Sequence, residues 1–455
     1  MKNLTEGNIY KTFILFSLPL VLGGVLSQSF NLIDTVIAGQ FLGETGLAVM
    51  GSVSPLITFV SSIYWGLGSG FAIFIAKLFG EGDNKKIKSS IGSMYLLYVL
   101  GLLLLGVFLI VFHDFVFELL NIDQSIKEET LAYYNVYVGG LFLIISNTFW
   151  LFIFNSFGMS QLPFLMSIIS SVLNLGGNIF SVVVLKIGVL GIALSSVITA
   201  GIIDVIYLIR LSFIFKDLGV EKEKLIDFSS LNGSFGYSIP SCIQQIIMYV
   251  VTLLVSPLVN GLGSSASAGY SVVSFIYNFM AAVFQNSSKT LSNYSAQCDG
   301  AKKYGVIKKG LFVGLLQGML LTIPLLVLIM IFYREICSVF FRQDASEEAR
   351  EYAYIFASRF SPFILFELVC NLFHALFRGV KAMRYLISST LFASVVRYIV
   401  TLIMIKNYGM TGFYIGWVTS WIAETAFVFV IYLIGRWKPE YRDAKALERQ
   451  KKSAA

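Results

Sequence analysis

The fold class follows from residues 130–185, which read TLAYYNVYVGGLFLIISNTFWLFIFNSFGMSQLPFLMSIISSVLNLGGNIFSVVVL and contain no charged side chain. A helix needs about 20 residues, at about 1.5 Å each, to cross a hydrocarbon layer of roughly 30 Å. This stretch can therefore hold two crossings, as can the uncharged residues 228–288, while 91–112 can hold one. The apolar runs are continuous, without the period-two alternation of a membrane barrel. The sequence predicts an all-α polytopic membrane protein.

The overall composition excludes a soluble fold. The 455 residues are 56% hydrophobic and 15% aromatic, and only 13% are charged, against about 25% in soluble domains. Mean hydropathy is +0.79 over the whole chain, so the apolar excess is not confined to one anchor. The net charge of +7 is interpreted as a signal of membrane topology, and no nucleic-acid partner is expected.

Breaks at glycine, proline and charge clusters divide the chain into twelve predicted transmembrane helices. The spans are 11–41, 47–76, 88–112, 129–157, 163–185, 188–214, 234–259, 268–294, 306–333, 350–377, 384–405 and 410–435. The run after Lys11 continues to Phe41 without a small-residue cleavage site, so we interpret it as a first span, not a signal peptide.

The distribution of positive charge predicts the orientation in the membrane. The termini and the even-numbered loops hold 24 Lys and Arg residues, whereas the opposite loops hold six. Positively charged residues concentrate on the cytoplasmic side of membrane proteins. We therefore expect a plasma (inner) membrane protein with both termini in the cytoplasm.

The two halves of the chain repeat at an almost constant offset. Four pairs are 221 residues apart and two more are 220 apart, which is hard to attribute to chance. The pairs are Ser17-Leu18-Pro19 with Ser238-Ile239-Pro240, Gly158 with Gly379, Gly188 with Gly409, Gly191 with Gly412, Leu42-Gly43 with Leu262-Gly263, and Gly80 with Gly300. Six spans per repeat place both repeats in the same orientation, an arrangement typical of alternating-access transporters.

This repeat sets the predicted domain boundaries. We expect a six-helix bundle at 1–215, a cytoplasmic linker at 216–233, a second bundle at 234–435 and a basic cytoplasmic tail at 436–455. Pro19 and Pro240 occupy matching positions in the two bundles and are the expected hinges, because proline removes a backbone hydrogen bond from a helix.

Charged residues inside spans are the first functional candidates, because each is costly in a bilayer. Asp34 lies far from any loop, on a helical stripe with Gln28 and Asn31, and is the leading candidate for binding H⁺ or Na⁺. Asn174 and Asn178 share a helix face and can either coordinate a cation or hold two helices together.

The remaining buried charges have less distinctive expected roles. Glu367 and Arg397 fall in consecutive spans, and we expect an ion pair, with a second coupling or substrate-facing acid at Glu367 as the other interpretation. Asp204 and Glu424, 220 residues apart, are expected to be structural. His113 and His374 lack metal-site spacing, and no resident metal or cofactor is expected. The four scattered cysteines indicate neither a zinc site nor a disulfide framework.

The common catalytic motifs are missing from the sequence. It contains no H-E-x-x-H, G-x-S-x-G or G-x-x-x-x-G-K-[ST] pattern, so we predict that the protein is not an enzyme. The less favoured alternative of a membrane-embedded transferase would need such a metal or nucleophile motif.

Several stretches together resemble the multidrug and toxic compound extrusion (MATE) transporters along essentially the whole chain. They are Pro19 followed by Asp34, Phe79-Gly80-Glu81-Gly82-Asp83, Asn174-x-x-x-Asn178 leading to Gly188-Val189-Leu190-Gly191-Ile192-Ala193, and Arg378-Gly379. The resemblance implies two bundles arranged as a V and cation-coupled export of cationic or amphipathic organic compounds. A lipid-linked saccharide flippase of the same superfamily is the alternative.

The resemblance also implies site residues. The H⁺ or Na⁺ site would use Asp34, Asn174, Asn178 and the hydroxyl of Ser196. Some relatives have an aspartate where this chain has Asn178, which leaves a single carboxylate. In the second half, the acid that some members carry in span 7 is absent, with Gln244 there instead, while Glu367 matches the spacing of a second acid. Expected partners are a small organic substrate and the lipid bilayer, with the protein a monomer.

Overall fold

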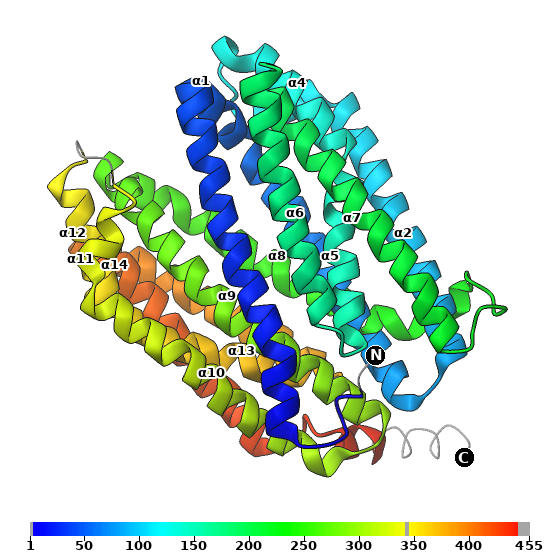
Figure 1. The fold of residues 1–455 in the computed structure, drawn as a ribbon. Coiled ribbons are helices and arrows are strands. Elements are labelled where there is room, and N and C mark those ends of the chain that lie inside the picture. Colours follow the sequence, from blue (N-terminus) through cyan, green and yellow to red (C-terminus); the bar gives the residue numbers. More distant parts are fainter. Residues whose placement is uncertain (1–2, 342–344, 445–455) are drawn as a thin grey trace. The chain divides into compact units, whose positions relative to one another are not determined.

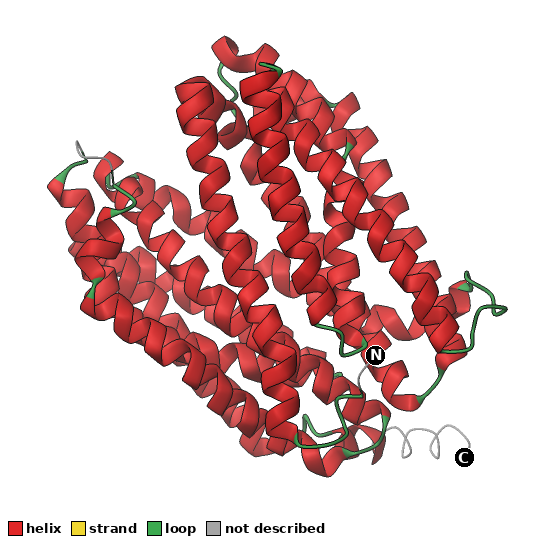
Figure 2. Cartoon of the chain, viewed as in Figure 1, coloured by secondary structure: helices red, strands yellow, loops and turns green. Residues whose placement is uncertain are grey.

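The computed structural model describes residues 3–341 and 345–444, apart from the side chains of residues 31–39 and 44. Within these residues every regular element is helical, as Figure 2 shows. The predicted all-α class is therefore confirmed. Continuous helix is the arrangement that satisfies backbone N–H and C=O groups without water, which a lipid-embedded chain requires.

Figure 1 labels most of the helices. They are α1 (Ile9–Glu81), α2 (Asn84–Val111), α3 (His113–Leu119), α4 (Lys127–Gly139), α5 (Leu141–Ser156), α6 (Gln161–Ile179), α7 (Val189–Asp217), α8 (Asn232–Asn260), α9 (Ser264–Gly300), α10 (Ile307–Ile331), α11 (Tyr333–Ser338), α12 (Glu347–Ile355), α13 (Ile364–Gly379) and α14 (Met383–Ile434). Short π-helical turns follow α6 at Phe180–Val184 and α12 at Phe356–Phe360.

The number of spans agrees with the twelve predicted. Ten helices among the described residues are long and apolar enough to cross a membrane, and the bent pair α4 and α5 makes an eleventh. The 52-residue α14 is interrupted at Gly409, so it contains two of the predicted spans. Side chains on α2 such as Leu104 and Val111 are exposed, as expected of a helix that faces lipid.

The glycines of the repeat explain where the helices begin. Gly188 caps α7 with φ 61°, and its counterpart Gly409 interrupts α14 with φ 53°. Positive φ at these angles strongly favours glycine. Three residues later, a Cβ at Gly412 would lie 2.2 Å from the Met404 carbonyl oxygen, and one at Gly191 would lie 2.6 Å from Ser181 Cβ. The repeated G-x-x-G thus combines a backbone turn with a close helix contact.

The chain divides into two compact units. The N-terminal unit comprises Met1–Asn3 and Leu22–Ser238, and the C-terminal unit comprises Leu4–Val21 and Ile239–Ala455. Their boundaries within α1 and α8 fall close to Pro19 and Pro240, the predicted hinges. Residues 445–455 of the predicted tail lie outside the described residues.

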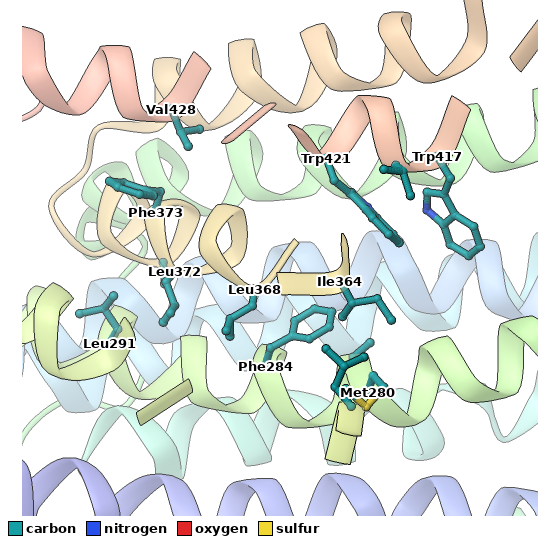
Figure 3. Close-up of a cluster of buried hydrophobic side chains, with 14 of the residues drawn as sticks. Met280, Phe284, Leu291, Ile364, Leu368, Leu372, Phe373, Trp417, Trp421 and Val428 are labelled. Atoms are coloured by element: carbon teal, nitrogen blue, oxygen red, sulfur yellow. The ribbon is translucent and has the colours of Figure 1, made fainter. Parts of the chain in front are cut away.

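In the N-terminal unit, α7 packs against α4, α5 and α6, and α2 packs against α4 and α5. In the C-terminal unit, α9 packs against α10, α12 and α13, and α13 also packs against α14. Figure 3 shows the apolar core of this second unit, in which Phe284 of α9, Leu368 of α13 and Trp421 of α14 are buried. These contacts fix the helices that carry the polar groups described next.

Candidate functional site

Three of the predicted coupling residues form a hydrogen-bonded chain inside the N-terminal unit. Asn178 Nδ2 donates to Asn174 Oδ1 at 3.0 Å, and Asn174 Nδ2 donates to Ser196 Oγ at 3.1 Å. The asparagines lie four residues apart on α6, and Ser196 belongs to α7. The chain therefore joins two spans through amide groups, whose oxygens are also suitable cation ligands.

Small residues allow α6 and α7 to approach closely beside this chain. A Cβ at Gly177 would lie 2.9 Å from Ser195 Oγ, so a larger side chain would push the helices apart. Ser195 Oγ donates to the Gly191 carbonyl at 2.8 Å. Asn178 is the most buried member of the chain, with 2% of its surface exposed. Close approach of this kind is how membrane helices pack tightly.

The leading candidate, Asp34, belongs to α1, but its side chain lies outside the described residues. The assignment of Asp34 as the coupling carboxylate stays a prediction.

A second polar cluster occupies the C-terminal unit, with Gln244 of α8 at its centre. Arg378 Nη2 donates to Gln244 Oε1 at 2.7 Å. Gln244 Nε2 lies 3.2 Å from Thr390 Oγ1 and 3.3 Å from His374 Nδ1. The amide thus connects α8 with α13 and α14, and it is 3% exposed.

The expected ion pair between Glu367 and Arg397 is not formed, although both residues are described. Glu367 is 7% exposed and accepts a hydrogen bond from Asn371 Nδ2 at 2.8 Å, within its own helix. The Arg397 guanidinium instead lies over the Trp417 ring, 4.9 Å from its centroid. Each costly group therefore has a local partner, the arginine through a cation–π contact.

The structure also brings in Asn371, His374 and Arg378, which were not predicted as site members. Together with the predicted Glu367 they recur at intervals of four, three and four residues, so the four form one polar stripe along α13. That spacing was available in the sequence. The partners on α14, Ser389 and Thr390, carry no comparable signal, because single hydroxyls are common in membrane helices.

Asp204 of α7 is also buried, with 3% of its surface exposed, and two neighbours on α5 bind it. Ser146 Oγ donates to one carboxylate oxygen and Asn147 Nδ2 donates to the other at 3.0 Å. Its contacts therefore fasten α7 to α5.

Comparison with known proteins bears on the whole chain. The family model described as MatE matches residues 19–180 and 240–403, so its two matched stretches begin 221 residues apart. The chain is 25% identical over 361 residues to the probable multidrug resistance protein YoeA of Bacillus subtilis, covering 75% of each chain. It is 23% identical to the probable multidrug resistance protein YpnP of the same organism, covering 95% of this chain and 97% of that one.

Solved structures match the fold over a similar extent. The Vibrio cholerae MATE transporter VcmN in its bent form superposes with a TM-score of 0.83 at 18% identity, covering 93% of this chain and 96% of that one. The outward-facing structure of a multidrug resistance MATE family transporter gives a TM-score of 0.86 at 16% identity, covering 96% and 99%. At these identities the likeness establishes the fold. The family-model match over both halves shows that the chain belongs to the MatE family, the multidrug and toxic compound extrusion transporters.

Proposed function

We propose that this protein is a secondary active exporter of cationic or amphipathic organic compounds, driven by antiport of H⁺ or Na⁺ with alternating access. The observation that supports it most is the chain from Asn178 through Asn174 to Ser196. This chain provides oriented amide groups in the unit that also contains Asp34. The B. subtilis relatives, with names that denote multidrug resistance, support the substrate class.

The proposed coupling chemistry requires one carboxylate. Asp34 would bind the cation in one orientation of the transporter and release it in the other, while the asparagine oxygens complete its surroundings. Because residue 178 is an uncharged asparagine, the pocket would change by a single charge in each cycle.

Glu367 is the proposed second coupling or substrate-facing acid, with Gln244 and Arg397 in the same unit. Pro19 and Pro240 are the proposed hinges. We further propose that the protein acts as a monomer in the plasma (inner) membrane, with cytoplasmic termini and without enzymatic activity, resident metal or cofactor.

Uptake of a fluorescent organic cation into inside-out proteoliposomes tests this function. The lumen is made acidic or rich in Na⁺, and wild type is compared with Asp34→Asn. Asp217→Asn is the matched control, since it makes the same chemical change at an exposed residue. We expect one gradient to drive uptake by wild type and Asp217→Asn, and Asp34→Asn to lose it.

Two results would contradict the proposal. Uptake by Asp34→Asn at the wild-type rate would remove Asp34 from the coupling site. A wild type that ignores both gradients would contradict antiport, and flipping of a lipid-linked saccharide would then be assayed. The names of the relatives do not favour that alternative.

A further inference from the structure

The polar cluster of the C-terminal unit contains a buried carboxylate oxygen that lacks a hydrogen bond. Glu424, on the second half of α14, is 6% exposed. Its Oε1 lies 3.2 Å from His374 Nε2, yet it accepts no hydrogen bond from the described residues. Because a buried ionised carboxylate is costly without donors, this oxygen requires an explanation.

The contacts of Gln244 fix the protonation state of His374. An arginine has only donors, so the Gln244 atom 2.7 Å from Arg378 Nη2 must be the amide oxygen. The amide nitrogen then faces His374 Nδ1 at 3.3 Å and donates to it. Nδ1 is consequently an acceptor, and the ring is neutral with its single proton on Nε2.

Ser389 accepts a hydrogen bond from the remaining N–H of His374. The Ser389 hydroxyl donates to the Leu386 carbonyl at 3.1 Å, so its oxygen is free to accept from His374 Nε2, 2.9 Å away. The only N–H of the ring is thus directed at Ser389. Glu424 Oε1 lies beside the same nitrogen without receiving its hydrogen.

The groups around the pair do not supply a countercharge by direct contact. Glu424 interacts electrostatically with Glu367 and Cys370 on α13 and with Tyr277 on α9. The cationic groups of the same unit have other partners: Arg378 contacts Gln244, Arg397 lies over Trp417 and Lys289 donates to Asn286. Among the described residues, no Lys or Arg forms an ion pair with Glu424.

We propose that Glu424 and His374 form a proton-binding site of the C-terminal unit. Glu424 takes up the proton, and Gln244 and Ser389 hold His374 neutral beside it. Binding of H⁺ converts the open carboxylate into a neutral acid and removes a buried charge. This site is separate from the proposed coupling site at Asp34, and it does not depend on the exporter proposal.

The pair lies where a change in charge can alter helix contact. Thr425, the next residue, donates to the Phe366 carbonyl at 3.1 Å, which fastens α14 to α13. Trp421, one turn before Glu424, stacks on Tyr277 with ring centroids 5.9 Å apart. Figure 3 shows Trp421 and Val428 of α14 and Phe373 of α13 in the same apolar core. In the sequence, Glu424 lies between Trp421 and Val428, about one turn from each. Tryptophan fluorescence is therefore a suitable reporter.

The test is a pH titration of the full-length protein in detergent, followed by tryptophan fluorescence and by the infrared C=O band of protonated carboxyl groups. Glu424→Gln is compared with Glu118→Gln, which makes the same change at an exposed residue. We expect Glu424→Gln to lose the band of one buried carboxylic acid and the linked fluorescence change, and Glu118→Gln to keep both. Persistence of that band in Glu424→Gln would overturn the proposal.

Ser389→Ala provides an independent test that removes no titratable group. Without the serine oxygen, the His374 ring can turn until Nε2–H points at Glu424 Oε1, 3.2 Å away in the present structure, and this hydrogen bond stabilises the carboxylate. We expect the midpoint of the pH titration to move to lower pH in Ser389→Ala. Proton binding should be about tenfold weaker, because the new hydrogen bond stabilises the charged form of Glu424. An unchanged or higher midpoint would contradict the proposal, even if Glu424→Gln failed to fold. Because neither measurement involves transport, failure of the exporter proposal would leave these results unaffected.

Discussion

Asn178 contributes an uncharged amide to the hydrogen-bonded chain of Asn178, Asn174 and Ser196. It is almost fully buried, and its amide N–H donates to Asn174 Oδ1. A protonated aspartate at 178 would keep the observed hydrogen bond, whereas an ionised one would be buried facing the Asn174 oxygen unless the Asn174 amide turned over and accepted from Ser196 instead. The side chain at position 178 therefore determines whether the hydrogen bond between residues 178 and 174 is retained at neutral pH.

We expect Asn178→Asp to lose stability as pH rises. The folded state would hold the added proton more tightly than the unfolded state, so stability is greatest at low pH and falls as the proton is lost. Thermal unfolding in detergent at several pH values measures this. Asn174→Asp is the matched control, because Asn174 donates to the Ser196 hydroxyl, which can itself donate to a carboxylate. If the stability of both variants depended on pH in the same way, the proposed role of the hydrogen bond between residues 178 and 174 would be refuted.

The sequence alone predicts the pairing of Asn174 with Asn178 but not that of His374 with Glu424. The first pair is four residues apart on one helix, so periodicity alone reveals it. The second pair joins residues 50 apart on two helices, and their meeting depends on how α13 packs against α14. The expected pair of Glu367 with Arg397 failed for a related reason. Adjacency of two spans does not determine which side chains meet, and the Arg397 guanidinium lies over the Trp417 ring instead.

Among the helices, the repeated glycines provide the sharpest link between sequence and structure. Gly409 has φ 53° and ψ −131°, with open space where a Cβ would be. The requirement there is conformational and not steric. We therefore expect Gly409→Ala to lower the free energy of unfolding by about 1–3 kcal/mol, the usual cost of such a backbone conformation.

Gly176 is the matched control for that substitution. It also has open space around it, but it lies in α6 without a positive φ. Alanine there should leave the unfolding midpoint unchanged or raise it, since glycine destabilises a helix interior by about 0.5–1 kcal/mol relative to alanine. Equal losses in Gly409→Ala and Gly176→Ala would show that backbone strain is not the cause.

The predicted helix boundaries were accurate where glycines and charged residues separate the spans. They were less accurate where a helix is bent or broken within a predicted span. The span predicted at 129–157 is bent by 43° between α4 and α5. The span predicted at 350–377 contains a π turn and a 3₁₀ turn before α13 begins. Such turns depend on tertiary packing, and hydropathy along the sequence does not reveal them.

For the whole molecule, the distribution of Lys and Arg predicts which loops face the cytoplasm. We expect a cysteine at Lys222, between α7 and α8, to react with a membrane-impermeant maleimide only from the cytoplasmic side. A cysteine at Glu128, at the start of α4, should react only from the opposite side. Labelling of intact cells and inverted vesicles measures this.

The native cysteines should contribute little labelling of their own once Cys242 is replaced. Cys298, Cys337 and Cys370 are buried, whereas Cys242 is partly exposed, so the variants are made with Cys242→Ala. Labelling of both positions from the same side would contradict the predicted topology.

In the proposed mechanism, substrate export and cation entry are one coupled exchange. The most direct test uses proteoliposomes that contain a pH-sensitive or Na⁺-sensitive dye. No ion gradient is imposed, and the organic cation is more concentrated inside the vesicles than outside. We expect wild type to move H⁺ or Na⁺ inward as the compound leaves, and Asp34→Asn not to do so. Efflux of the compound without any counter-movement of either ion would contradict it.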